Sequence, residues 1–277
     1  MRKIRYSQKQ FKFSPNKMNW QQEKHYFLTA VMFFTRFQVP VSLPYSDEIQ
    51  HFSRKYFPFI GVLIGSLAAL TIYLTNLVLP LPLAVVLSIV ISVLITGALH
   101  EDGFADCCDG FGGGWQKQQI LSIMKDSRVG TYAVVCLSLL LAIKILSLIE
   151  LGSISLTLLL VTYINGHSLS RLGASLCIDC LDYVQNDEQS KAKSMASKKL
   201  SYKSLIFSAV LITPFFFLLL AVNPAYVFSL IPMWLTFLLI TRYFKKRIDG
   251  YTGDCLGAMQ QVLEAVFYLS IIALSLT

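Results

Sequence analysis

The stretch from Gly97 to Thr131 separates two long apolar segments and reads GALHEDGFADCCDGFGGGWQKQQILSIMKDSRVGT. If a helix continues into it from the preceding apolar run, Asp102, Asp106 and Asp109 fall at positions i, i+4 and i+7. That spacing places the three carboxylates on one helical face, which suits an Mg²⁺ ion. We therefore expect this polar island to carry the chemistry of the protein.

Glycines and phosphate-binding side chains accompany these acids. Lys125, Ser127 and Arg128 follow a short amphipathic segment and offer hydrogen-bond donors for phosphate. Glycines in the same stretch would let the backbone turn sharply and approach a ligand closely. They are Gly103, Gly110, Gly112, Gly113 and Gly114.

The whole chain is too apolar for an ordinary soluble domain. Of its 277 residues, 55% are hydrophobic and only 14% are charged, and the mean hydropathy is +0.57. This composition predicts an all-α, polytopic membrane protein whose spans take ~20 residues each. We expect seven spans, at Tyr56–Leu79, Leu83–Leu99, Tyr132–Ile149, Ile154–Leu176, Leu205–Val222, Ala225–Tyr243 and Met259–Leu276.

The distribution of positive charge predicts the orientation, because Lys and Arg collect in cytoplasmic loops. With seven spans, the short connections 80–82, 150–153 and 223–224 share one side and contain neither residue. We therefore expect a prokaryotic cytoplasmic (inner) membrane protein with its polar loops and active site on the cytoplasmic side. The net charge of +8 is then explained by topology, and no base-stacking module suggests nucleic-acid binding. The segments on the other side are 1–55, 100–131, 177–204 and 244–258, which contain 10, 3, 5 and 3 Lys or Arg residues.

The N-terminal region differs from the rest of the chain. Residues 1–24 are basic and polar, so we expect a flexible or surface-bound arm followed by one membrane-embedded catalytic domain, residues 25–277. The apolar run 25–43 is interrupted by Arg36 and Pro40, which favours an interfacial or re-entrant helix over a span.

Charged residues also occur inside the predicted spans, where ionisable groups are costly. Lys144 is expected to extend toward the nearby interface. Arg171 fits either that behaviour or phosphate binding. His167, in the same span, is expected to be a hydrogen-bonded core histidine.

A second island of glycine and aspartate, residues 248–258, contains Asp254 and lies on the same predicted side as the first. Folding could bring Asp254 to Asp102, Asp106 and Asp109. Hard carboxylate oxygens without matching histidine or cysteine ligands favour Mg²⁺ or Mn²⁺ over zinc. The other interpretation is that these acids are helix caps and solvated loop residues beside a membrane; an EF-hand pattern is absent.

Three motifs of this sequence resemble those of the cobalamin synthase family. They are His100-x-Asp102-Gly103-x-Ala105-Asp106-x-x-Asp109-Gly110, Ile123 to Thr131 (IMKDSRVGT) and Thr252-Gly253-Asp254-x-Leu256-Gly257-Ala258. Members are integral-membrane adenosylcobinamide-GDP ribazoletransferases. The resemblance implies Mg²⁺-dependent attack of a ribose hydroxyl of α-ribazole, or of its 5′-phosphate, on adenosylcobinamide-GDP. This reaction releases GMP and is the last assembly step of the cobalamin nucleotide loop. Glu101 departs from the family pattern, in which an apolar residue is frequent.

Residue roles follow from the two lines of reasoning taken together. Asp102, Asp106, Asp109 and Asp254 are the expected metal ligands, with one of them serving as base. Lys125 and Arg128 are assigned to the diphosphate, and His100 to orientation or proton handling. The remaining expected substrate-binding residues are Ser127, Arg171, Gly110 and Gly253.

Two other functional classes stay open from sequence alone. A transporter or channel could use the same acids to bind a coupling cation, although acids at the membrane edge count against transport. A scaffold for other corrinoid-pathway enzymes would leave the aspartates replaceable. Self-association, and association with such enzymes, also stay open.

Overall fold

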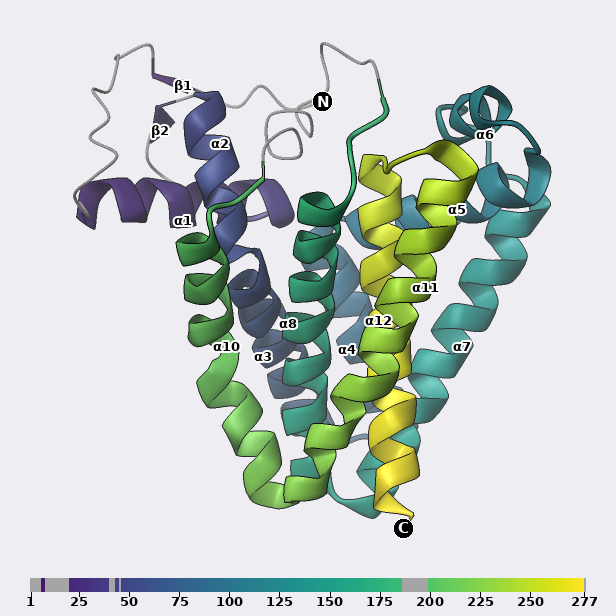
Figure 1. The fold of residues 1–277 in the computed structure, drawn as a ribbon. Helices are drawn as coiled ribbons and strands as arrows, with labels where there is room; N and C mark the ends of the chain where they lie inside the picture. Colours follow the sequence, from purple (N-terminus) through teal and green to yellow (C-terminus); the bar gives the residue numbers. More distant parts are fainter. Residues whose placement is uncertain (1–5, 8–19, 40–42, 45, 186–198, 277) are drawn as a thin grey trace.

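Long helices running up and down form the body of the protein (Figure 1). The computed structural model describes residues 6–7, 20–39, 43–44, 46–185 and 199–276. The two-residue strands β1 (Tyr6–Ser7) and β2 (Leu43–Pro44) pair in parallel, so the expected helical membrane fold is confirmed with this small addition. The long helices are α3 (Phe57–Thr75), α4 (Leu81–Thr96), α7 (Thr131–Ile154), α8 (Leu156–Cys180), α10 (Tyr202–Val222), α11 (Leu230–Ile248) and α12 (Gly253–Ser275).

Each predicted span corresponds to one of these helices, but not all are equally apolar. Among the described residues, 5 segments are long and apolar enough to cross a membrane alone; they contain α3, α7, α10, α11 and α12. The short α4 reaches this level only together with the following helix, α5 (Leu99–Gly113), and the two are bent by 89°. The result is a multi-pass membrane protein with five such helices, or up to 6 counting the bent pair, where seven spans were expected.

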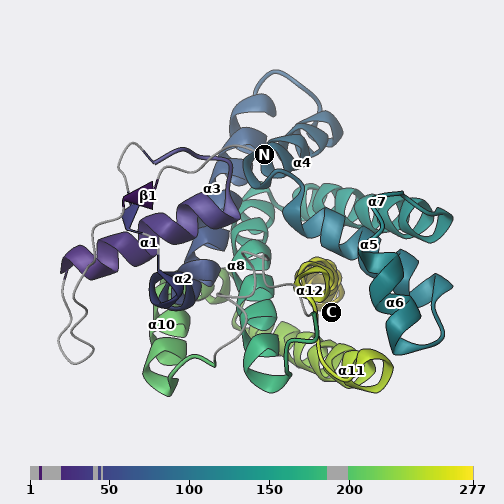
Figure 2. The same ribbon diagram turned by 90° about the horizontal axis from the view of Figure 1, so that it is seen from above.

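The polarity of α8 explains why it does not belong to this set. It is 25 residues long, yet Asn165, His167 and Arg171 interrupt its apolar character. These side chains are buried in the protein, where the surrounding helices shield them from lipid. Viewed from above, α8 and α12 lie in the middle of the bundle (Figure 2).

Two glycines allow α3 to approach α8 closely. A Cβ atom on Gly61 would overlap the carbonyl oxygen of His167, and one on Gly65 would lie 2.8 Å from the Cα of Ile164. Their four-residue spacing places both on one face of α3, as in membrane helix pairs that pack through small residues.

The N-terminal helix α1 (Trp20–Phe34) lies across one end of the bundle (Figure 1), as an interfacial helix would. It begins within the segment that we predicted to be a flexible arm. Lys55 forms an ion pair with Glu23 at 2.6 Å, and the hydroxyl of Tyr56 donates to Glu23 at 2.7 Å. These contacts join α1 to the chain that leads from α2 (Asp47–Ser53) through the turn η1 (Arg54–Tyr56) into α3. The rest of the predicted arm, apart from Tyr6 and Ser7, lies outside the described residues.

The polar elements gather at that same end of the bundle. Helix α5 lies across it, and α6 (Lys117–Met124) stands beside α5 (Figures 1 and 2). The opposite end contains short connections, including the turn η2 (Pro224–Ser229). The acidic island is therefore at the polar end of the bundle.

Candidate active site

A sharp break between α4 and α5 presents the acidic helix at the end of the bundle. Gly97 and Ala98 have φ values of +67° and +58°, both in the left-handed region. The expected continuous helix is therefore wrong: α4 stops at Thr96 and α5 starts a new direction at Leu99. The 89° bend turns α5 so that it lies across the polar end of the bundle instead of continuing along α4.

Within α5 the predicted helical spacing of the acids is confirmed. Asp102, Asp106 and Asp109 all lie within its 15 residues. Gly103 is next to Asp102 and packs on α12, where a Cβ would come within 2.9 Å of the Cα and carbonyl oxygen of Asp254. This close approach brings the first turn of α12 against the acidic helix, as the convergence of the two islands predicted.

Electrostatic effects at Asp106 show how close these acids are. Partial burial, and then the negative charges of Asp254, Asp102 and Asp109, raise the pKa of Asp106 from 3.8 to about 7. Carboxylates crowded in this way are stabilised by a cation. Their hard oxygen donors fit Mg²⁺ in chemistry. In the described part of the chain, however, no three His, Cys, Asp or Glu side chains are arranged to hold one metal ion.

Asp109 also has a structural role. One carboxylate oxygen accepts a hydrogen bond from the backbone N–H of Gly130 at 2.6 Å, and the other accepts from Ala133 at 2.9 Å. Helix α7 begins at Thr131, so Asp109 satisfies backbone donors at its start. The carboxylate ties α5 to α7 and fixes the loop that contains the predicted phosphate-binding residues.

In that loop, Arg128 is engaged with its neighbour Asp126. Its Nε and Nη2 atoms donate to the carboxylate at 3.0 and 2.6 Å. These hydrogen bonds lower the pKa of Asp126 to about 2. Lys125 and Ser127 are exposed beside them. The loop is thus tied to α5 through Asp109, and within the loop Arg128 is held by Asp126.

The remaining predicted site residues lie in or near the helix contacts. His100 is buried, and its ring stacks on Phe57 with 5.8 Å between centroids. Gly110 packs α5 against α6, since a Cβ there would lie 2.6 Å from the side chain of Met124. Gly253 is the first residue of α12. Arg171 is only 1% exposed, so the structure places it inside the bundle and away from solvent.

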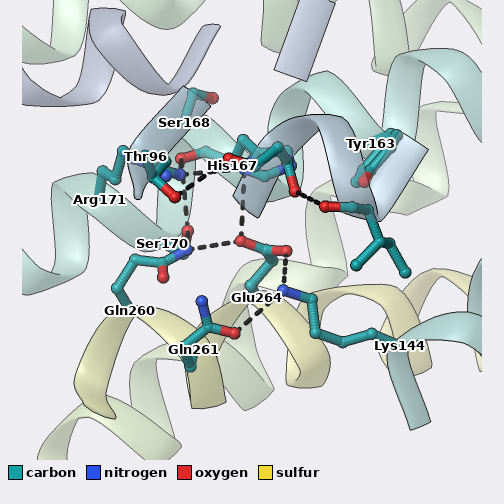
Figure 3. Close-up of polar contacts among 12 residues, drawn as sticks. Thr96, Lys144, Tyr163, His167, Ser168, Ser170, Arg171, Gln260, Gln261 and Glu264 are labelled. Carbon is teal, nitrogen blue, oxygen red and sulfur yellow. Dashed lines mark hydrogen bonds and ion pairs between the residues drawn. The ribbon is translucent and has the colours of Figure 1, made fainter. Parts of the chain in front are cut away.

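A buried polar network extends from this region into the bundle, and the sequence did not predict it (Figure 3). Glu264 forms an ion pair with Lys144 at 2.6 Å and accepts a hydrogen bond from Tyr268 at 3.0 Å. Gln261 accepts from Lys144 at 3.0 Å and donates to Glu101 of α5 at 2.9 Å. The network therefore connects α7 and α12 to the acidic helix.

Other members of the network come from α8. The backbone carbonyl of His167 accepts a hydrogen bond from Arg171 at 2.8 Å. The ring Nδ1 atom of His167 lies 3.5 Å from a carboxylate oxygen of Glu264. His167 is thus a buried histidine with polar partners, as predicted. The expected extension of Lys144 to the interface is wrong, because Lys144 is 4% exposed and pairs with an acid. The only sign of this ion pair in the sequence was one charged residue in each of two apolar segments, Lys144 in α7 and Glu264 in α12.

Comparison with known proteins shows the family of the chain. The family model described as CobS, cobalamin-5-phosphate synthase, matches residues 26–272. The chain belongs to the CobS family. No solved structure matches the chain.

The similarity to individual relatives extends over nearly the whole length of both chains. An adenosylcobinamide-GDP ribazoletransferase of Shewanella frigidimarina is 40% identical over 94% of this chain and 98% of that relative. One of Shewanella amazonensis is 42% identical over 92% of this chain and 97% of the relative. One of Vibrio parahaemolyticus is 38% identical over 89% and 91%. The family and these names identify the chain as a transferase enzyme of cobalamin biosynthesis, which speaks against a transporter or a noncatalytic scaffold.

Proposed function

We propose that this protein is an adenosylcobinamide-GDP ribazoletransferase that joins the lower nucleotide ligand to the corrinoid at a membrane surface. The match to CobS over residues 26–272 is the observation that carries the proposal. The geometry supports it, because α5 and α12 bring two separated aspartate motifs together at the polar end of the bundle.

In the proposed reaction, a ribose hydroxyl of α-ribazole, or of its 5′-phosphate, attacks the phosphorus bonded to the aminopropanol arm of adenosylcobinamide-GDP. A new P–O bond forms with this hydroxyl, and the P–O bond to GMP breaks. GMP departs with the electron pair of the broken bond, and one of the site carboxylates accepts the hydroxyl proton. The products are adenosylcobalamin, or its 5′-phosphate, and GMP.

We propose that Mg²⁺ binds at Asp102, Asp106 and Asp254 together with phosphate oxygens of the substrate, because protein-bound Mg²⁺ commonly takes one or two carboxylates and completes its coordination with substrate phosphate and water. The ion would neutralise negative charge on the phosphate oxygens. The raised pKa of Asp106 is consistent with this assignment, since after burial its causes are the negative charges of Asp254, Asp102 and Asp109 nearby. Asp109 was predicted as a fourth ligand. Because both its oxygens accept backbone hydrogen bonds, we assign it to holding α5 and the loop before α7 in place.

The site is proposed to face the cytoplasm across a prokaryotic cytoplasmic membrane. Helices α1, α5 and α6 lie at one end of the bundle (Figure 1), as does the last turn of α11, which contains Lys245, Lys246 and Arg247. The connections at the other end, 80–82, 150–153 and 223–224, contain no Lys or Arg. That asymmetry is the signature of cytoplasmic loops.

The direct test uses purified protein in detergent with Mg²⁺, adenosylcobinamide-GDP and α-ribazole. We expect cobalamin and GMP to appear in equal amounts, and chelation of Mg²⁺ to stop their formation. Asp106→Asn and Asp254→Asn should each lower kcat by at least about 100-fold, as expected when a charged group at the reacting phosphate is removed. Absence of both products with folded wild-type protein would reject the function. Full activity in both variants would reject the metal site alone.

A further inference from the structure

Arg36 is an exposed arginine whose backbone is fixed at the junction of α4 and α5. Its backbone N–H donates to the carbonyl of Ile95 at 2.7 Å. The hydroxyl of the preceding residue, Thr35, donates to the carbonyl of Val31 at 2.6 Å and accepts from the N–H of Phe37 at 3.2 Å. These bonds hold the chain that follows α1 against the end of α4.

The side chain of Arg36 lies directly over Gly97. A Cβ atom at Gly97 would overlap Nε of Arg36 and would lie 2.7 Å from its Cζ. Gly97 also has a φ of +67°, which disfavours most other residues. The glycine therefore makes the bend between the helices and also leaves the space in which the guanidinium lies.

The charge of Arg36 is not neutralised by the protein in the part of the chain that the structure describes. Its guanidinium forms no ion pair or hydrogen bond with the side chains described there, whereas Arg128 binds the carboxylate of Asp126. Asp102 lies in the first turn of α5, five residues after Gly97, so Arg36 lies near the start of the acidic helix. Of these two arginines, Arg36 is the one whose guanidinium makes no hydrogen bond or ion pair with the described residues, so all of its side-chain donors are available to a ligand.

We propose that Arg36 binds a phosphate group of the nucleoside-diphosphate-activated substrate beside the site formed by Asp102, Asp106 and Asp254. A guanidinium presents parallel donors that match two phosphate oxygens. Its fixed backbone and the space over Gly97 limit the entropy lost when the side chain binds. The assignment rests on the proposed function, and it adds a substrate-binding residue outside the predicted diphosphate loop.

Substrate kinetics and nucleotide binding test the proposal separately. In Arg36→Ala, KM for adenosylcobinamide-GDP and the Kd for GDP with Mg²⁺ should both rise by about 10- to 100-fold, the usual effect of losing charged hydrogen bonds. KM for α-ribazole should stay close to the wild-type value. Arg36→Lys should give intermediate values, because lysine retains the charge without the paired donors. Arg242→Ala, which removes an exposed arginine on α11, is the matched control and should change none of these constants.

A variant at Gly97 tests the space over the glycine. Asparagine tolerates the left-handed region better than most residues, so Gly97→Asn fills the space while permitting the bend. It should raise KM for adenosylcobinamide-GDP in the wild-type background. Combined with Arg36→Ala, it should add little further, because the two changes disturb the same guanidinium.

The outcomes separate this proposal from the function on which it rests. If wild-type protein forms no cobalamin, the proposed function fails, and GDP binding by Arg36→Ala still decides the role of Arg36. If Arg36→Ala only lowers the melting temperature and leaves KM and the GDP Kd unchanged, Arg36 stabilises the end of α4 and the proposal is wrong. The proposal would also be overturned if the Arg36→Ala protein had the wild-type melting temperature and still bound the substrate with the wild-type KM and Kd.

Discussion

The aspartates of the acid cluster make different contacts, so their substitution should have different effects. Asp109 accepts two backbone hydrogen bonds at the start of α7. Asp109→Ala leaves both donors without this partner and should lower the free energy of unfolding by about 1–2 kcal/mol, as for loss of a helix cap. Urea unfolding in detergent measures the change. Asp102→Ala, at an exposed position of the same helix, is the control, and equal destabilisation by both variants would contradict the assignment.

Asp106 should make Mg²⁺ binding depend on pH near neutrality. Its pKa of about 7 in the metal-free protein means that a proton competes with the ion below that pH. Mg²⁺ affinity should therefore fall up to about tenfold for each pH unit below 7 and level off above it. Titrations of Mg²⁺ between about pH 5.5 and 8.5 measure this, with Asp106→Asn as the control that loses the dependence.

The raised pKa of Asp106 also makes the stability of the metal-free protein depend on pH, but with the opposite sign: higher pH favours Mg²⁺ binding and lowers this stability. The folded-state pKa of Asp106 is raised above its ordinary value of 3.8. The carboxylate is therefore protonated more readily in the folded state, and this contribution to stability is lost as pH rises from 3.8 through about 7. Asp106→Asn should melt at a higher temperature than wild type at neutral pH without Mg²⁺. A lower melting temperature would show that repulsion among the acids is not important.

At the scale of the helices, the contact between α5 and α12 depends on the absence of a side chain at Gly103. Alanine is favoured over glycine in a helix by about 1 kcal/mol, so Gly103→Ala would stabilise an isolated α5. In the protein its Cβ would meet the backbone of Asp254 at 2.9 Å, which neither helix can relieve by a side-chain rotation. We expect lower stability and a loss of transferase activity.

Gly113→Ala is the matched control for this contact. Its Cβ would come only to 3.3 Å from the end of the flexible Ile123 side chain, so the substitution should be tolerated. Melting temperature and turnover are measured for both variants. Stabilisation by Gly103→Ala with retained activity would show that the two helices need not approach so closely.

The helices show which features could be predicted from local sequence. The face shared by Asp102, Asp106 and Asp109 depends only on helical spacing, and the structure confirms that they lie on one helix. The break before that helix was missed because Ala98 adopts a left-handed conformation that its sequence does not favour. The bond from Arg36 to Ile95 forms at this point, so tertiary contacts accompany the break.

At the scale of the whole molecule, the buried ion pair joins α7 to α12 in the centre of the bundle. Lys144→Met would leave Glu264 buried without its cationic partner, and breaking such a pair costs about 3–5 kcal/mol. The double variant Lys144→Met with Glu264→Leu removes both charges and should recover part of the loss. Thermal unfolding in detergent compares the three proteins. An equal loss in single and double variants would show that shape, and not charge, stabilises this contact.

This pair also marks the limit of sequence analysis for the site. Lys144 and Glu264 were each visible as an isolated charge in an apolar segment, and extension of Lys144 to the interface satisfied the same energetic requirement as pairing. Only the packing of α7 on α12 distinguishes the two. The expected number of seven membrane spans has the same limit. It included α8, whose polar residues are compatible with a membrane only when neighbouring helices cover them, and that covering is a property of the packed bundle.

The orientation of the whole molecule decides which compartment supplies the nucleotide substrate. Val129, 73% exposed, follows α6 at the polar end, and Val78, 81% exposed, lies in the turn between α3 and α4. A membrane-impermeant maleimide added to intact spheroplasts should label Val78→Cys, and it should label Val129→Cys only after lysis. Both variants are made with Cys180→Ser, which removes an exposed native thiol. Labelling of Val129→Cys in intact spheroplasts would place the aspartates outside the cell, away from cytoplasmic nucleotides, and would contradict the charge distribution that predicts a cytoplasmic site.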